Sequence, residues 1–146
     1  MFDALTRLFA KSDPRLSSQD PKLAVAALLV HLAAVDGQIK EEERRAVRAV
    51  LQDQYGLGEA AVEALIKQAT ASDADSVDLY RFTSALSGLE SQERIDIIRM
   101  MWLVVFADKK NHELEDNMVW RIAELIGVSA RDRTILRNQI GKSQGV

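Results

Sequence analysis

Four carboxylates recur at one spacing in this chain of 146 residues. Asp36 precedes Glu43 by seven residues, and Asp108 precedes Glu115 by the same seven. Carboxylate oxygens suit hard cations such as Ca²⁺ and Mg²⁺, with Mn²⁺ as a third option, whereas zinc and copper favour nitrogen and sulfur donors. If the fold brings the two pairs together, their repulsion favours a bound cation. The spacing therefore raises the hypothesis of one acidic site for a divalent cation.

The spacing differs from that of an EF-hand. That loop needs a ligand at its third position and glycine at its sixth, whereas here Gly37 directly follows the aspartate and Gln38 is third. His112 precedes Glu115 by three residues, so both side chains can face one side of a helix start. We expect His112 to cap the N-terminus of that helix, in preference to acting as a metal ligand or supporting one.

A helix start is the alternative explanation for the two glutamates. The helix dipole favours acidic residues in the first turn. If Lys40 and His112 are N-caps, Glu43 and Glu115 occupy the third helical position, from which a capping-box glutamate reaches back to the backbone N–H of the cap. Lys and His lack the hydroxyl that completes such a box. This alternative leaves the repeated aspartates unexplained.

Apolar residues recur at helical intervals along the chain, without the alternation of strands. Asp20 and Pro21 form an N-cap followed by proline at the first helical position, and Gly56 and Gly127 are expected helix ends. The pattern predicts an all-α fold of six or seven helices. After a short N-terminal helix, they cover about residues 21–35 and 40–55, a stretch that begins near residue 58 and precedes a polar turn at 70–78, and about residues 79–89, 91–107 and 112–126. A last helix from residue 129 faces inward through Ile135, Leu136 and Ile140.

The two halves of the chain match at an offset of 72 residues. Each half contains an apolar helix, an Asp-led turn, a Glu-bearing helix and a glycine end. This predicts two duplicated helix-turn-helix halves with approximate twofold symmetry. The matched pairs are Asp36 with Asp108, Glu41 with Glu113, Glu43 with Glu115, Val47 with Val119, Val50 with Ile122 and, after one insertion, Gly56 with Gly127.

Two stretches carry a family resemblance. "AAVDGQIKEEER" and "VVFADKKNHELEDNMVWRIAELIGVS" resemble the TerB-like family of small bacterial proteins named for tellurite resistance, over about residues 22–137. The resemblance implies an all-helical fold with duplicated halves and a metal site made from acidic residues of the two turns. Its aspartates fall on Asp36 and Asp108, and its glutamates on Glu43 and Glu115.

The second turn departs from the family pattern. Lys109 and Asn111 stand where a glycine and an aliphatic residue are usual, while the first turn keeps Gly37 and Ile39. If Gly37 adopts a positive φ, Lys109 must do so at a steric cost or the second turn must differ. We expect residues 1–20 to form an amphipathic helix and linker, and residues 21–146 to form the TerB-like domain.

Bulk properties exclude several functions. The chain has 19 basic and 22 acidic residues and no cysteine, which argues against nucleic-acid binding, disulfides and thiolate chemistry. The N-terminus does not resemble a secretory signal, so we expect a cytoplasmic location. No motif suggests an enzyme or identifies a small-molecule substrate. Arg44, Arg45 and Arg48 form a basic edge that we expect to be solvated.

Two functional hypotheses remain. The first is a metal-binding helical module linked to tellurite or general stress response. In this hypothesis the module docks on a protein partner, with a membrane-associated protein as one candidate. The second is a metal-independent protein-protein interaction scaffold in which the acidic residues only start helices. A third, metal-assisted hydrolysis, would need an open coordination position and a substrate pocket that the sequence does not indicate.

Overall fold

The computed structural model describes residues 20–35, 37, 39–75, 79–108 and 113–145. Within these residues the chain forms seven α-helices and no strand, which confirms the predicted all-α fold. The expected N-terminal helix and most of its linker lie outside the described residues. The helices are α3 (Pro21–Ala33), α4 (Glu41–Tyr55), α5 (Glu59–Asp75), α6 (Leu79–Ser84), α7 (Ser91–Val105), α8 (Glu113–Ile126) and α9 (Ala130–Ser143).

Helix α3 begins as predicted and is buried on nearly all sides. The Asp20 side chain accepts a hydrogen bond of 3.0 Å from the backbone N–H of Lys22, and Pro21 takes the first helical position. Ten of the 13 residues of α3 are buried. A helix that is apolar all round must be covered by its neighbours on every face, so α3 requires partners from both halves of the chain.

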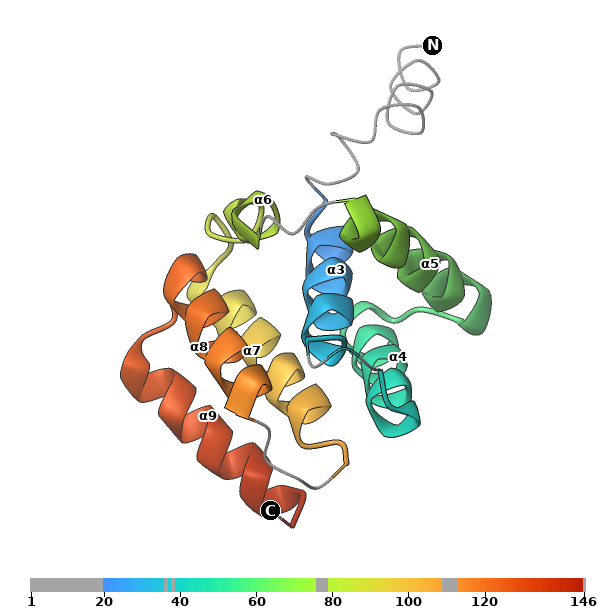
Figure 1. Ribbon diagram of the computed structural model, residues 1–146. Coiled ribbons are helices and arrows are strands. Elements are labelled where there is room, and N and C mark those ends of the chain that lie inside the picture. Colours follow the sequence, from blue (N-terminus) through green and yellow to red (C-terminus); the bar gives the residue numbers. More distant parts are fainter. Residues whose placement is uncertain (1–19, 36, 38, 76–78, 109–112, 146) are drawn as a thin grey trace.

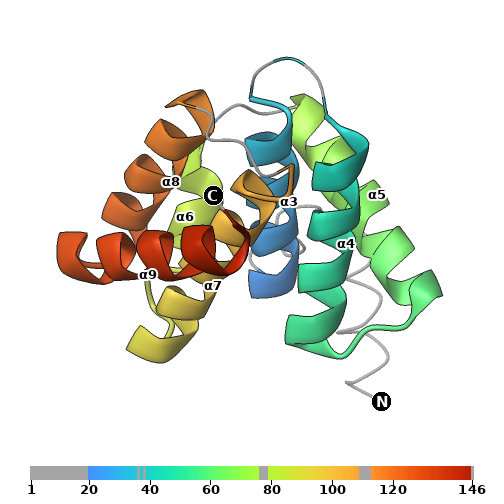
Figure 2. The ribbon, with the colours of Figure 1, turned by 90° about the horizontal axis from the view of Figure 1, so that it is seen from below.

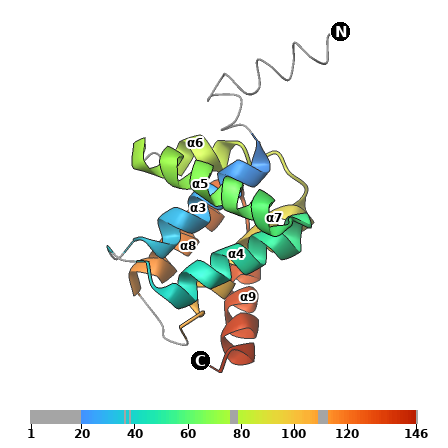
Figure 3. The same ribbon diagram turned by 90° about the vertical axis from the view of Figure 1, so that its right-hand side faces the viewer.

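Six of the helices form two groups, and α6 packs on α3 and α8. Helices α3, α4 and α5 pack on one another on the right of Figure 1, and α7, α8 and α9 pack on one another on the left. Contacts of α3 with α7 and α8, and of α4 with α7, join the groups. Seen from below in Figure 2, α3 and α7 lie between the outer helices. In Figure 3, α9 extends past the other helices toward the C-terminus.

Helices α4 and α8 end in the same way. Gly56 and Gly127 follow them with φ of 62° and 84°. After each glycine, the next backbone N–H bonds back into the helix, from Leu57 to the Gln52 carbonyl at 3.2 Å and from Val128 to the Ala123 carbonyl at 2.9 Å. This is the Schellman arrangement, which glycine permits because it has no Cβ. The predicted helix ends at both glycines are confirmed.

One residue of the predicted inward face of α9 was wrong. Ile135 of α9 is 43% exposed, whereas Leu136 and Arg133 of the same helix are buried. Arg133 lies one turn before Leu136 and Arg137, so a charged residue shares the inward face of α9 with Leu136. The prediction holds for Leu136, which is buried, and for Ile140, which packs against the core.

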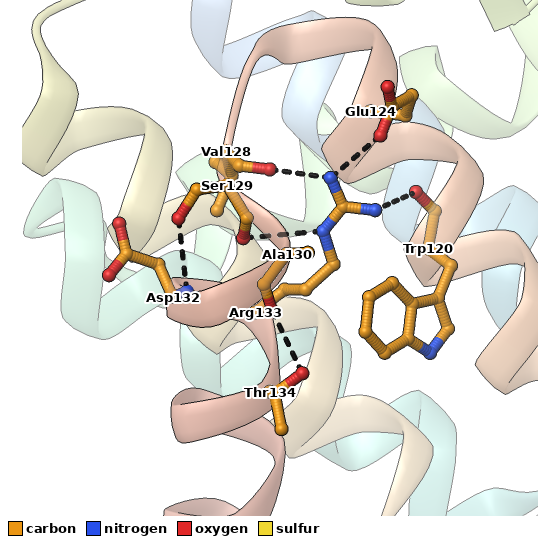
Figure 4. Close-up of polar contacts among 8 residues, drawn as sticks. All are labelled: Trp120, Glu124, Val128, Ser129, Ala130, Asp132, Arg133 and Thr134. Carbon is orange, nitrogen blue, oxygen red and sulfur yellow. Dashed lines mark hydrogen bonds and ion pairs between the residues drawn. The ribbon is translucent and has the colours of Figure 1, made fainter.

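The guanidinium of Arg133 can be buried because every part of it is hydrogen-bonded (Figure 4). It donates to the backbone carbonyls of Trp120, Val128 and Ser129, at 3.2, 2.7 and 3.4 Å, and to the Glu124 carboxylate at 2.8 Å. It also lies over the Trp120 ring, 4.8 Å from the centroid. Because these acceptors belong to the end of α8 and the following corner, Arg133 fixes α9 against α8.

Replacing this arginine should weaken the fold. We expect Arg133→Met to lower the free energy of unfolding by about 3 kcal/mol, because the buried carbonyls lose their donor. Urea unfolding followed by circular dichroism measures the change. Arg131→Met is the control, since Arg131 is exposed on the same helix and should change stability by less than about 0.5 kcal/mol. Equal small effects would contradict the assigned role of Arg133.

The phenol of Tyr55, at the end of α4, has a raised pKa. Burial raises its pKa to about 12, and the negative charges of Asp20 and Glu93 act in the same direction. Its ordinary pKa is about 10. The protonated phenol therefore contributes stability that is complete below about pH 10 and is lost as the pH rises through about 12.

This shift predicts a late tyrosine titration. The ultraviolet absorbance of wild type minus Tyr55→Phe should show one phenol ionising near pH 12. Circular dichroism at each pH verifies that the chain is still folded. A midpoint near pH 10 in the folded protein would show that Tyr55 is not shielded in this way.

Candidate metal site

At the start of α4, one glutamate is buried while the two before it are exposed. Lys40 is the N-cap, with φ of −78° and ψ of 155°, which places Glu43 at the third helical position as the helix-start alternative requires. Glu41 and Glu42 are exposed, whereas Glu43 is 0% exposed. A favourable interaction with the helix dipole operates at the surface and does not require burial. The helix start thus accounts for Glu41 and Glu42 better than for Glu43.

The start of α8 repeats this arrangement. Glu113 is exposed, and Glu115, the third residue of the helix, is 0% exposed. Removing an ionised carboxylate from water costs several kcal/mol unless charges and hydrogen bonds compensate. Two such carboxylates at matching positions of two helices indicate a common local environment for both helix starts.

An ion pair joins the start of α4 to the second acidic turn. The Lys40 ammonium Nζ donates to Asp108 Oδ2 at 2.8 Å, across 68 positions of sequence. The Asp108 side chain is 8% exposed and that of Lys40 is 36% exposed. Lys40 provides no side-chain cap to α4, so the capping box is incomplete on this side. The ammonium instead holds the end of α7 beside the beginning of α4.

The predicted ligands can be placed only in part. Glu43, Asp108 and Glu115 are described, whereas Asp36 and His112 lie outside the described residues. Among the residues that are described, no three His, Asp or Glu side chains are grouped as metal ligands. The structure thus places Asp108 beside Lys40, and Lys40 follows Asp36 by four residues in the sequence. It also buries Glu43 and Glu115.

Helix α9 supports the start of α8. The Arg137 guanidinium donates to Asp116 Oδ2 at 2.8 Å, beside Glu115 in sequence. The same guanidinium lies 5.5 Å from the ring centroids of both Trp102 and Phe106, which stack on each other near the end of α7. Arg137 thereby ties the last turn of α7 to the first turn of α8, the two elements that flank the second acidic turn.

The positioning roles of Lys40 and Arg137 were not foreseen in the sequence. A lysine four residues after Asp36 was a visible signal of charge compensation, but nothing local identified Asp108 as its partner. Arg137 follows Asp116 by 21 positions, beyond any helical spacing rule. Both contacts depend on how separate helices pack.

A family model described as Tellurite resistance protein TerB matches residues 22–138. The chain belongs to the TerB family. Comparison with curated proteins and with solved structures found no match. The match confirms the resemblance carried by the two acidic stretches. None of the described helices of this TerB domain combines the length and apolar character needed to cross a membrane.

The first turn of the TerB domain has the backbone conformation that its glycine suggested. Gly37 has φ of 97°, and its N–H donates to the Ala34 carbonyl at 2.9 Å. A side chain at this φ would be strained even though the surrounding space is open. Lys109, at the equivalent place in the second turn, lies outside the described residues, so the expected difference between the turns stays a prediction.

The ion pair between Lys40 and Asp108 can be measured by a double-mutant cycle with Lys40→Met and Asp108→Asn. We expect a coupling free energy of about 1 kcal/mol, because Asp108 is nearly buried while Lys40 is partly solvated. Urea unfolding of the four proteins gives this value. The matched control is the pair Arg45 and Glu41, 3.5 Å apart and exposed on α4, with coupling of about 0.3 kcal/mol. Coupling no larger than that control would contradict the link between the turns.

Proposed function

We propose that this TerB domain is a helical module that binds a divalent cation, Ca²⁺ or Mg²⁺ first and Mn²⁺ as a third option. The ligands in this proposal are Asp36, Glu43, Asp108 and Glu115, with His112 supporting one of them. The observation that carries the proposal is the 2.8 Å contact of Lys40 with Asp108. It sets the start of α4 against the second acidic turn, as a shared site requires.

The burial of the two glutamates supports the same site. Glu43 and Glu115 are both 0% exposed, and each is the third residue of its helix. Carboxylate oxygens of this kind match the chemistry of a divalent cation. The shared helix ends at Gly56 and Gly127 support an approximate duplication, which would put the two acidic turns at corresponding positions of the two halves.

The Lys40 ammonium would compete with a divalent cation for Asp108. Its ammonium neutralises one carboxylate oxygen of Asp108, and a divalent cation at Asp108 would repel that ammonium. Because Lys40 is 36% exposed, its side chain can turn into solvent. Cation binding would then loosen the direct contact between α4 and the end of α7 and replace it with a metal bridge.

The biological role follows the family description. We propose a part in tellurite resistance or a general stress response. In this role the ion sets the shape of the acidic face on which a protein partner docks, with a membrane-associated protein as one candidate partner. This role is one of binding rather than catalysis. Its supports are the family match over residues 22–138 and the acidic residues on that part of the chain.

A metal-independent protein-protein scaffold is the second candidate, and the same ion pair favours it. Lys40 itself supplies a positive charge at Asp108. In this version the ammonium is the permanent partner of the acidic turn, and Glu41 and Glu42 merely begin α4. The two candidates make opposite predictions about added ions.

Thermal unfolding separates the candidates. We expect Ca²⁺, Mg²⁺ or Mn²⁺ to raise the Tm of the metal-stripped protein, since an ion that binds only the folded state stabilises it. An ion at about 100 times its Kd contributes about 2.7 kcal/mol, or about 5–10 °C in Tm for a domain of this size. The increase should disappear in the variant that combines Asp36→Asn with Asp108→Asn.

A charge-matched control is Glu41→Gln with Glu42→Gln, which removes two carboxylates from exposed positions of the same helix start. It should keep the ion-dependent increase in Tm. The comparison uses the shift caused by the ion, because Asp108→Asn also breaks the pair with Lys40. A flat Tm at millimolar ion in wild type, or a shift that survives the double aspartate variant, would favour the scaffold.

A further inference from the structure

A cavity of about 230 Å³ lies among α3, α4 and α5, and Ile39 of the first acidic turn is part of its lining. Its walls are mainly apolar and include Ala33 of α3, Val47 of α4 and Ile66 of α5. Arg44, Arg48, Glu63 and Thr70 add polar groups to the lining. Ligand sites in proteins commonly combine such an apolar enclosure with a few polar groups.

The two arginines that line the cavity, Arg44 and Arg48, differ in whether nearby carboxylates neutralise their charge. Arg48 donates to the Glu59 carboxylate at 3.0 Å and also pairs with Glu63, so neighbouring carboxylates compensate its charge. Arg44 has no ion pair within the part of the chain that the structure describes. The uncompensated positive charge of the cavity therefore belongs to Arg44.

We propose that this cavity binds a small organic carboxylate with a compact apolar body. The carboxylate would pair with the Arg44 guanidinium, whose planar fork suits two carboxylate oxygens, and the apolar body would contact Ala33, Val47 and Ile66. Glu63 disfavours a second negative charge, which selects monoanions over phosphate dianions. The volume equals that of about eight liquid waters, which suits a ligand with a similar number of non-hydrogen atoms.

This site differs in chemistry from the proposed metal site. The metal site needs several carboxylate oxygens, whereas the cavity presents a guanidinium and hydrocarbon. Both use α4, but Arg44 and Val47 line the cavity and Glu43 is buried away from solvent. Because the carboxylate ligand needs no divalent ion, a test in the presence of a chelator is independent of the proposed function.

The test is a titration of the full chain with hexanoate in the presence of a chelator, followed by methyl NMR. Saturable shifts should occur at Val30, Val47 and Ile66. Arg44→Gln should raise the Kd about tenfold or more, as expected for loss of a charge-assisted hydrogen bond, and Arg44→Lys should restore part of the affinity. Arg45→Gln is the matched control, because Arg45 lies next in sequence but does not line this cavity.

Two further probes separate the contributions of charge and hydrocarbon. Hexanol retains the apolar body without the charge, and acetate retains the charge without the body, so each should bind at least about tenfold more weakly than hexanoate. Absence of saturable shifts with hexanoate would overturn the proposal. So would shifts that cluster at other residues, equal binding of hexanol, or equal losses in Arg44→Gln and Arg45→Gln.

Discussion

The burial of α3 on almost every face is the constraint on which this domain depends. A helix with ten buried residues out of 13 cannot be covered by α4 and α5 alone, so α6, α7 and α8 complete the enclosure. This packing decides where the turns lie. The end of α7 comes to the start of α4, where Lys40 meets Asp108. The closeness of the two halves is thus a consequence of apolar burial, and the ion pair fixes its details.

Local signals made much of the fold predictable. Asp20 and Pro21 start α3, and the glycines after α4 and α8 end those helices by a motif that needs a positive φ. These features act within a few residues, so they can be read along the chain. On α9 the burial of Arg133 was missed because it depends on contacts with the carbonyls of another helix and its corner. Hydropathy assigns arginine to solvent and cannot anticipate such partners.

In the candidate site, too, some features could be predicted from local sequence and others depend on how the helices pack. The spacing of Glu43 and Glu115 singled out two carboxylates that are both buried, although their metal-binding role stays a prediction. The partner of Asp108 was not predictable, because Lys40 is 68 positions away and the contact depends on how α4 packs on α7. The basic edge is exposed at Arg44 and Arg45, as expected, but its three residues do not share one environment. Arg44 and Arg48 line a cavity that Arg45 does not, a distinction that requires the placement of α5.

Helix α4 is the element that the proposed metal site and the proposed carboxylate site share. Lys40 connects its beginning to Asp108, while Arg44 and Val47, one and two turns further, belong to the cavity. Val47, Val50 and Leu51 are buried, so α4 cannot rotate freely without losing core contacts. A ligand at either site would therefore act on the other mainly through a small shift of the whole helix. Since coupling between two sites is reciprocal, a cation that displaces Lys40 would change carboxylate affinity by the same factor as the carboxylate changes cation affinity.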